Sequence, residues 1–345
     1  MHLIRGRIFK RDFFVKYLIT GAAGFVGSHL TERLSSLGHS VIALDLGFSE
    51  EVKSIFQSLP NVQSVVGSVL DKELLFKLIQ KSEYVIHLAA IASPEYYVNQ
   101  PKRTIDLNLN ASIAIIEMLR FTGKNFFYTS TSEIYGKNPA VPWSENDDRV
   151  LGSTDINRWC YSTSKAMIEH YLYACHQEQS LNFSGVRIFN CYGPRLKGRV
   201  VDSFLHAIST NTPIVIHGDG KQTRCFTYID DLIDAIISLV TAKKASNKFY
   251  NIGSSVETTI DDLASIACDL VGLKKDEFVR YVPHSVAIGS SYEDIPRRVP
   301  NTELAEFELG WKPRVTLQQG MKLMYDYISK YDHLDAMPSF GEVDE

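Results

Sequence analysis

The sequence predicts an α/β protein, in which a doubly wound parallel sheet is joined to a smaller, mainly C-terminal α/β lobe. Three observations support this prediction. Apolar runs of strand length alternate with segments of helical periodicity up to about residue 190. A glycine-rich turn follows the first apolar run, and prolines and glycines divide the chain beyond residue 190 into shorter pieces. Repeated strand–helix alternation is typical of parallel sheets with helices on both faces.

The elements of the first half follow from apolar patterning. Short apolar runs predict strands at 16–20, 40–45, 62–69, 84–90, 125–131 and 183–190. After the glycine turn, leucines from Leu30 to Leu37 recur at helical spacing. Similar patterns predict helices at 74–79, 105–120 and 159–179. We therefore expect residues 16–190 to form a sheet-centred domain.

The second half predicts the smaller lobe over residues 191–333. Helical patterns occur at 204–208, 230–240, 258–271 and 316–331. Short strands are predicted at 213–217, 249–252 and 278–282. A basic extension at 1–15 precedes the sheet domain, and an acidic tail at 334–345 follows the lobe.

The composition narrows the classes of partner. The 345 residues include 36 lysines and arginines against 40 aspartates and glutamates, and the net charge of −4 argues against general nucleic-acid binding. No run of about 18 apolar residues occurs, so we expect no membrane span. Five cysteines without a C-x-x-C pair favour a reducing, cytoplasmic location, and the scattered histidines predict no metal site.

The turn between the first strand and the first helix predicts a dinucleotide site. It contains Gly21, Gly24, Phe25, Val26 and Gly27. Glycines here allow a tight turn and a close approach of the backbone to a pyrophosphate, as in Rossmann-type folds, and the helix N-terminus directs free N–H groups at the phosphates. Asp45 ends the second strand, where a carboxylate can accept both ribose hydroxyls of NAD and repel the 2′-phosphate of NADP. We therefore expect NAD as cofactor.

Tyr161 and Lys165 form a second candidate site. They lie four residues apart on a predicted helix and so share one face. A phenol titrates near about 10, and a close ammonium would favour the phenolate and give a base that works nearer neutrality. Thr131 ends its strand, the usual place for ligands in such sheets, and its hydroxyl could bind the same substrate oxygen. The pattern predicts proton transfer.

Longer motifs connect these sites across the chain from Lys16 to Tyr331. They are T-G-A-A-G-F-V-G-S-H-L from Thr20, H-L-A-A from His87, S-T-S-E-I-Y-G from Ser130, Y-S-T-S-K from Tyr161, R-I-F-N-C-Y-G-P-R from Arg187, R-C-F-T-Y-I-D-D-L from Arg224 and L-G-W-K-P from Leu309. Together they resemble the extended short-chain dehydrogenase/reductase family, specifically its NAD-dependent nucleotide-sugar epimerases, dehydratases and decarboxylases.

This resemblance implies roles for individual residues. The family's catalytic triad is matched by Thr131, Tyr161 and Lys165. Its contacts to sugar and diphosphate are matched by Asn190 and Arg224. Further cofactor contacts are implied for Val69, Leu88 and Ala89. One departure is Ser68, which stands where the family often has an aspartate that meets adenine.

The family usually dimerises through two helices of each subunit. The predicted helices at 105–120 and 159–179 match those positions. Their apolar residues Ile113, Ile116, Met167 and Leu172 could form the contact, or could pack on the sheet. The resemblance therefore implies a homodimer.

Within the family, three segments resemble UDP-glucuronate decarboxylases. Thr131-Ser132-Glu133 reproduces their T-S-E, which also occurs in some 4,6-dehydratases. The loop at 93–101 resembles their substrate loop, and Tyr97 matches the tyrosine that meets the glucuronate. The segment at 292–298 resembles the one whose arginine acts near the sugar C5, with Arg298 as the match and Tyr292 as a further substrate contact. Gly198-Arg199-Val200-Val201 resembles the UDP-xylose synthases, which implies a substrate contact for Arg199.

The expected function is decarboxylation of UDP-glucuronate, to UDP-xylose or its 4-keto pentose, through a transient 4-keto sugar. Tyr161 would take the C4 hydroxyl proton, and Thr131 and Tyr161 would stabilise the enolate left by CO₂. Glu133 and Arg298 would orient the carboxylate or manage the proton at C5. The rival readings are a 4-epimerase, a 4,6-dehydratase with Glu133 as the C5 base, and a non-catalytic NAD-binding protein. Arg298 could instead be a surface residue paired with Asp294 or Glu293.

Overall fold

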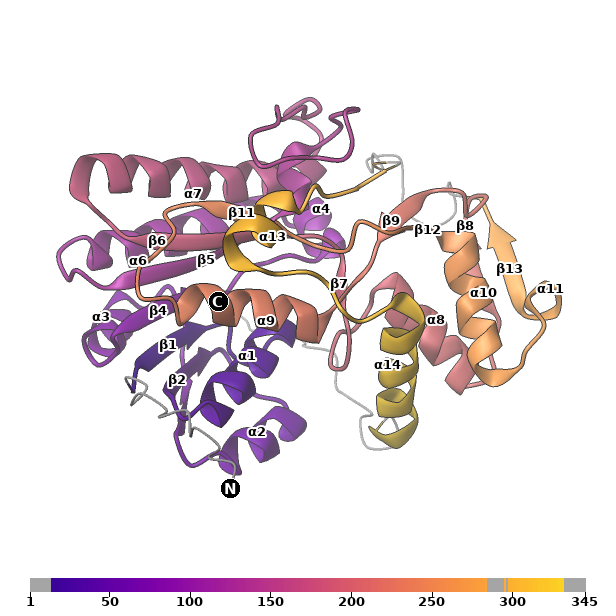
Figure 1. Cartoon of the computed structure of the whole chain (residues 1–345), viewed down its shortest axis with the longest axis horizontal. Helices are drawn as coiled ribbons and strands as arrows, with labels where there is room; N and C mark the ends of the chain where they lie inside the picture. Colours follow the sequence, from indigo (N-terminus) through magenta and orange to yellow (C-terminus); the bar gives the residue numbers. More distant parts are fainter. Residues whose placement is uncertain (1–13, 284–294, 296, 332–345) are drawn as a thin grey trace, which may run out of the picture.

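The computed structural model describes residues 14–283, 295 and 297–331 (Figure 1). The predicted acidic tail lies outside these residues, as does the basic extension except for its last two positions. Tyr292 also lies outside them. In the described part of the chain, no helix is long and apolar enough to cross a membrane.

Seven parallel strands form the central sheet in the order β11-β6-β5-β4-β1-β2-β3. The strands are β1 Lys16–Thr20, β2 Ser40–Asp45, β3 Val62–Val66, β4 Tyr84–His87, β5 Asn125–Thr131, β6 Phe183–Ile188 and β11 Phe249–Ile252. Most of their apolar side chains are buried, which is typical of parallel strands covered on both faces. The strand order reverses between β1 and β4, and ligands bind at such a point beyond the carboxyl ends of the strands. The doubly wound prediction is confirmed.

Helices cover both faces of this sheet. One face carries α1 Phe25–Ser36, α2 Glu50–Gln57 and α9 Ile229–Val240. The other carries α3 Lys72–Gln80, α6 Ser112–Leu119 and α7 Arg158–Gln179. Side-chain caps fix the start of two of these helices. The side chains of Ser49 and Asp71 accept hydrogen bonds from backbone N–H groups in the first turns of α2 and α3. Ile116 and Leu172 are fully buried against the sheet, so for these two residues packing on the sheet, the second of the two possibilities, is what the structure shows.

The helix predicted at 105–120 has a different form. It consists of α5 Pro101–Ile105, the π-helical η1 Asp106–Ala111 and α6. Pro101 starts the helix earlier, because proline suits the first helical position. Within η1, the Asn108 side chain accepts from the N–H of Ile91 at 2.8 Å and donates to its carbonyl at 3.0 Å. The widened turn thereby holds the loop after β4.

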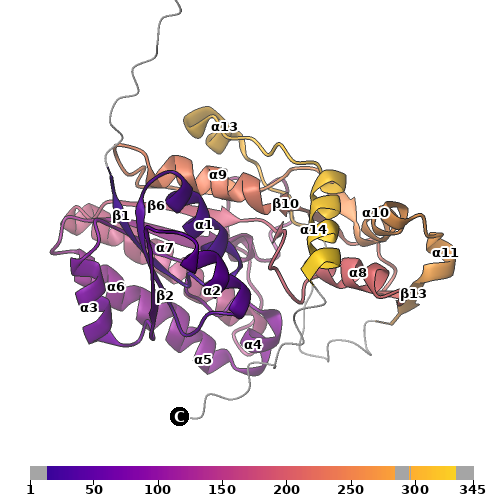
Figure 2. The same cartoon turned by 90° about the horizontal axis from the view of Figure 1, so that it is seen from below.

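The smaller lobe lies beside the carboxyl ends of the central strands (Figures 1 and 2). It contains α8 Val200–Ser209, β8 Ile214–His217, β9 Thr223–Cys225, β12 Glu257–Thr259, α10 Ile260–Val271, α11 Lys275–Phe278, β13 Val279–Val282 and α14 Leu317–Tyr331. β8 pairs with β13 and β9 with β12. Two connecting strands, β7 Cys191–Tyr192 and β10 Thr227–Tyr228, also pair.

The chain returns from the lobe to the central sheet. Residues 249–252, predicted within the lobe's range, form the edge strand β11 beside β6. The short helix α13 Glu303–Leu309 is attached to this strand by Glu308, which accepts from Lys248 at 2.5 Å and from the Tyr250 hydroxyl at 2.7 Å. Segments distant in sequence therefore meet at this edge of the sheet.

Candidate active site

A cavity of about 620 Å³ lies at the carboxyl ends of the central strands and extends to the lobe. Its lining includes these predicted site residues: Gly21, Gly24, Phe25, Val26, Gly27, Leu88, Tyr97, Thr131, Glu133, Tyr161, Lys165, Asn190, Arg199, Arg224 and Arg298. Asp45, Val69 and Ala89 are not among the lining residues. One continuous cavity therefore brings together segments from Gly21 to Arg298.

The turn between β1 and α1 has no room for side chains at two positions. Gly21 has a φ of +73°, and a Cβ there would lie 2.6 Å from the backbone nitrogen of Ala89. A Cβ on Gly27 would lie 2.1 Å from the carbonyl oxygen of Gly21. No side chain caps the start of α1, so its first N–H groups remain available to a ligand. This cradle fits a pyrophosphate.

Asp45 lies behind this turn at the end of β2. Its Oδ2 accepts from the N–H of Ala23 at 2.8 Å, and its Oδ1 from that of Leu46 at 2.7 Å. These bonds tie the carboxylate to the glycine turn, next to the place where the ribose of a dinucleotide would lie. Val69 is buried against the core on the α3 side of the sheet. The residues at the turn fit NAD, with Asp45 available to its ribose.

Lys165 and Tyr161 lie on one face of α7, both buried at the cavity. The Nζ of Lys165 donates to the carbonyl of Thr129 at 2.9 Å, and burial lowers its pKa to about 7. Burial and the charge of Glu133 raise the pKa of Tyr161 to about 12, although a hydrogen bond with Thr131 lowers it. The pKa of the phenol is therefore raised rather than lowered in the protein alone, because desolvation and Glu133 act more strongly than Thr131 and Arg199, which lower it.

Glu133 is held by two arginines. It lies in the short 3₁₀ helix η2, Ser132–Tyr135, directly after β5. Its Oε1 accepts from Arg298 at 2.6 Å, and its Oε2 from Arg158 at 3.1 Å. Burial would raise the pKa of the Glu133 carboxyl, but the charges and hydrogen bonds of both arginines outweigh it and lower the pKa. Arg298 is 7% exposed, so it is not a surface residue.

Arg158 is the residue that sequence reasoning missed. It is completely buried at the start of α7, three residues before Tyr161. Its guanidinium lies 5.4 Å from the ring centroid of Trp159. A position one helical turn before Tyr161 was the available signal, because residues three apart share a helix face. Nothing local to the sequence indicated that its partner would be Glu133.

Tyr97 lies against Tyr161 in the cavity. It lies in α4, Pro94–Asn99, and is 2% exposed. Its ring stacks on that of Tyr161, with centroids 5.1 Å apart. The substrate loop predicted at 93–101 therefore covers one face of the Tyr161 ring.

Three further predicted residues line the cavity nearer the lobe. Asn190 has a φ of +34°, and its side chain donates to the carbonyl of Cys225 at 3.2 Å. Arg199 donates to the carbonyl of Ala92 at 2.9 Å. Arg224 donates to the carbonyl of Thr223 at 2.8 Å. Both guanidinium groups thus lie at the cavity where a diphosphate could meet them.

Comparisons with known proteins agree with this geometry. A model of the NAD dependent epimerase/dehydratase family matches residues 17–253. A UDP-N-acetyl-alpha-D-glucosaminuronate decarboxylase of Bacillus cytotoxicus is 34% identical over 88% of this chain and 95% of its own. UDP-glucuronic acid decarboxylase 2 of Arabidopsis thaliana is 31% identical over 90% of this chain and 67% of its own.

The solved structures agree as well. The structure of UDP-glucose 4-epimerase from Thermotoga maritima, with UDP-glucose, has a TM-score of 0.81 to this chain. It is 29% identical, and the match covers 91% of this chain and 99% of that one. Since the family model spans more than half of the residues, the chain belongs to the NAD-dependent epimerase/dehydratase family, and its cofactor is NAD.

Proposed function

We propose that the protein decarboxylates a UDP-linked hexuronate, with UDP-glucuronate as the first candidate, through a transient 4-keto sugar. The product would be UDP-xylose or its 4-keto pentose. The names of the relatives from Bacillus cytotoxicus and Arabidopsis thaliana support this class of reaction. The first of them also makes the 2-acetamido analogue of UDP-glucuronate a candidate substrate.

The contacts of Glu133 carry the proposal. Both of its oxygens already accept hydrogen bonds from guanidinium groups, and its pKa is lowered. A carboxylate stabilised in this way is a weak base, which argues against removal of a C5 proton as a dehydratase would require. The same contacts suit an orienting role, since Glu133 fixes the guanidinium of Arg298 at the cavity.

We assign the substrate carboxylate to Arg298. It lines the cavity, and its Nε is buried without a hydrogen-bond partner among residues 14–283, 295 and 297–331. A buried guanidinium nitrogen is costly to leave unsatisfied, and planar carboxylates match guanidinium geometry well. A hexuronate supplies such a group, whereas the neutral hexose of an epimerase or dehydratase does not.

The proton chemistry is assigned to Tyr161. Bound NAD would supply the hydride acceptor that converts the C4 alcohol to a ketone. As the phenolate, which the positive charge of bound NAD would favour, Tyr161 would take the C4 hydroxyl proton, and Thr131, its hydrogen-bond partner, would hold the same oxygen. Once the ketone is β to the carboxylate, CO₂ can leave and its electron pair delocalises into an enolate. Hydrogen bonds from Tyr161 and Thr131 would stabilise that oxyanion.

The remaining contacts divide between the two parts of the molecule. We assign the pyrophosphate of NAD to the turn at Gly21–Gly27 and its ribose to Asp45, with Val69, Leu88 and Ala89 at the adenine and nicotinamide ends. We assign the sugar nucleotide to Tyr97, Asn190, Arg199 and Arg224. This assignment makes residues 16–190 mainly the cofactor domain and residues 191–333 mainly the substrate lobe.

The test is incubation of the purified protein with UDP-glucuronate, with products followed by mass spectrometry. Loss of CO₂ from the sugar supports the proposal, and the product mass distinguishes pentose from 4-keto pentose. Arg298→Met should lower kcat by about 100-fold or more. Arg297→Met is the matched control, because Arg297 pairs with Glu257 at 2.6 Å and should retain wild-type turnover.

Other products would decide between the remaining functions. A new sugar isomer of unchanged mass would indicate a 4-epimerase, and loss of water from UDP-glucose or dTDP-glucose would indicate a 4,6-dehydratase. Bound NAD without turnover of uronates or neutral sugars would favour a non-catalytic NAD-binding protein. Each of these results contradicts decarboxylation.

We also propose a homodimer and a cytoplasmic location. Met167 on α7 is 49% exposed, and Ile113 on α6 is partly buried. These two apolar residues could therefore contribute to a subunit contact, although Ile116 and Leu172 are buried in the core. The five cysteines are free thiols, which favours a reducing compartment. Light scattering that finds a monomer of 38.9 kDa would contradict the dimer.

A further inference from the structure

The segment that carries Arg298 has no helix or strand to fix it. Residues 297–302 form irregular chain apart from a single bridge between Trp143 and Pro300. Two backbone hydrogen bonds attach the segment to Trp143. The N–H of Trp143 donates to the carbonyl of Val299 at 2.8 Å, and the carbonyl of Trp143 accepts from the N–H of Asn301 at 2.7 Å. The position of Arg298 therefore depends on the position of Trp143.

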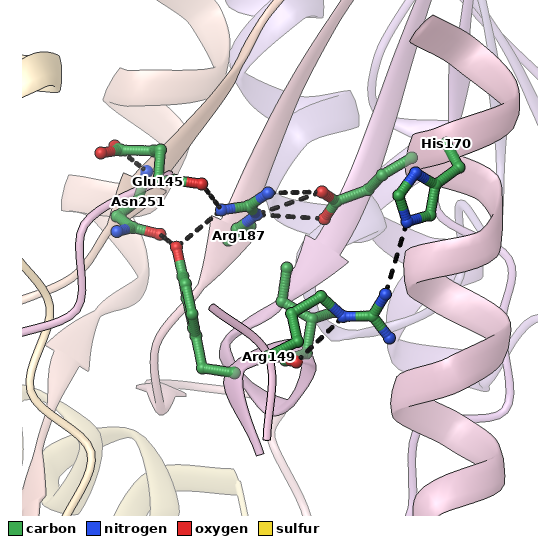
Figure 3. A network of polar contacts seen from close by, with 8 residues as sticks. Glu145, Arg149, His170, Arg187 and Asn251 are labelled. Atoms are coloured by element: carbon green, nitrogen blue, oxygen red, sulfur yellow. Dashed lines mark hydrogen bonds and ion pairs between the residues drawn. The ribbon is translucent and has the colours of Figure 1, made fainter. Parts of the chain in front are cut away.

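The turn that carries Glu133 depends on a second aromatic residue. Tyr135 ends η2, is fully buried and stacks on Trp143, with centroids 5.1 Å apart. Its hydroxyl accepts from the Nη1 of Arg187 at 2.7 Å and donates to the Oδ1 of Asn251 at 2.8 Å. Figure 3 shows Asn251 and Arg187 within this polar network.

Asn251 contacts both the turn that contains Glu133 and the segment that contains Arg298, through one carboxamide. It lies on β11 and is 0% exposed. Its Oδ1 accepts from Tyr135, and its Nδ2 donates to the carbonyl of Trp143 at 2.9 Å and to that of Asn301 at 3.3 Å. One end of the amide thus holds the Glu133 turn, and the other end holds the Arg298 segment.

The network extends to the helix of Tyr161 and Lys165. Arg187 on β6 donates to Glu169 at 2.6 Å, and Glu169 lies one turn after Lys165 on α7. The N–H of Asn251 also donates to the carboxylate of Glu145 at 2.8 Å (Figure 3). Buried networks of this kind are stabilising only when each member is satisfied, so they fix a single arrangement.

We propose that Asn251 is a positioning residue for the active site: its carboxamide sets the placement of Glu133 relative to Arg298. This inference deepens the proposed function and rests on it for the consequence in turnover. The amide is required because the site needs an acceptor toward Tyr135 and a donor toward two carbonyls at once. Asn251→Leu removes both ends at similar size, whereas Asn251→Asp retains the acceptor and removes the donor.

The experiment compares three variants by turnover, ligand binding and crystallography. Asn251→Leu and Asn251→Asp are expected to lose about 100-fold in kcat, the effect typical of a misplacement near 1 Å, with NAD and UDP affinities unchanged. Asn61→Leu is the matched control. Asn61 also donates to two carbonyls, of Ser35 and His39, and accepts from a hydroxyl, but it lies between β2 and β3 away from the cavity.

The crystal structures provide a readout that does not need activity. We expect the Arg298–Glu133 contact to be lost or displaced in both Asn251 variants and retained in Asn61→Leu. A retained contact in Asn251→Leu, or equal kinetic losses in Asn61→Leu and Asn251→Leu at equal stability, would overturn the inference. If wild-type protein releases no CO₂, the proposed function fails, while the crystal structures still decide the role of Asn251.

Discussion

The ring of Tyr97 lies flat against the ring of Tyr161, with centroids 5.1 Å apart and planes inclined by 10°. Tyr161 therefore has an aromatic wall on one face, supplied by a short helix from a different part of the chain. Its hydroxyl is fixed in addition by Thr131. The direction in which the phenol points is thus set by packing as well as by hydrogen bonding.

Replacing Tyr97 tests this wall. Stacked aromatic pairs contribute about 0.5–1.5 kcal/mol beyond their burial, so Tyr97→Leu should lower kcat by roughly fivefold through looser placement of Tyr161. Tyr97→Phe retains the ring and should keep most of the turnover. Steady-state kinetics check this, and equal losses in both variants would assign the effect to the Tyr97 hydroxyl instead.

Gly27→Ala should weaken cofactor binding. The added Cβ would lie 2.1 Å from the Gly21 carbonyl oxygen, so the turn must move away from its pyrophosphate-binding form. We expect NAD affinity, measured by calorimetry, to fall by at least about tenfold, or 1.4 kcal/mol. Gly185→Ala is the control, because its Cβ would meet the Phe249 ring at 2.3 Å. It should lose stability but keep its affinity for NAD.

Glu133→Gln should be strongly destabilising. It leaves the buried Arg298 and Arg158 without this carboxylate, and breaking a buried ion pair typically costs about 3–5 kcal/mol. Glu257→Gln breaks the more exposed pair with Arg297 and should have a much smaller effect, because exposed pairs are screened by solvent. Urea denaturation measures both. Similar losses in the two variants would mean that Glu133 contributes no more than a surface carboxylate.

The stabilising effect of Glu133 should also depend on pH. Because its pKa is lowered in the folded protein, the effect is fully present above the unfolded value of about 4.3. It should disappear as the pH falls through the lower folded value. The difference in unfolding free energy between wild type and Glu133→Gln should therefore shrink in acid, and a constant difference would contradict the lowered pKa.

Lys165 predicts a trend in the same direction, in a higher pH range. Burial lowers its pKa to about 7, whereas an unfolded lysine titrates near about 10.4. Between these values the unfolded chain binds a proton that the folded protein lacks, so this group's contribution to stability rises with pH. Lys165→Met removes the cost of the buried ammonium. The stability of this variant relative to wild type should be greatest below about pH 7 and should decline toward about pH 10. Urea titrations over this pH range measure the difference, and a difference that does not change with pH would contradict the lowered pKa.

Sequence reasoning found the parts of the site that are encoded locally. The turn from Gly21 to Gly27 and the pair Tyr161 and Lys165 depend on spacing within one turn or helix. These residues, like most of the strands, could therefore be predicted from the sequence. The position of Asp45 could also be predicted, because it ends a strand that is marked by a continuous apolar run.

The rest of the site depends on contacts between distant segments. Arg298 and Glu133 are 165 residues apart and meet through an irregular segment, which no periodicity describes. Arg158 was missed for the same reason. The pKa of Tyr161 is raised, although the sequence predicted that it would be lowered, because it depends on burial in the assembled cavity and on the charge of Glu133. The π-helical turn at Asn108 follows from its bonds to Ile91 rather than from helical propensity.

The return of β11 to the central sheet has a consequence for how the molecule unfolds. The chain leaves the sheet after β6, builds part of the lobe, and comes back through α9 and β11 before entering the lobe again. A cut after residue 190 would remove the neighbour of β6 and the acceptor of the Tyr135 hydroxyl together. Sheet and lobe are interlaced by the path of the chain, so no single cleavage yields two intact modules. The two parts should melt in one cooperative calorimetric transition.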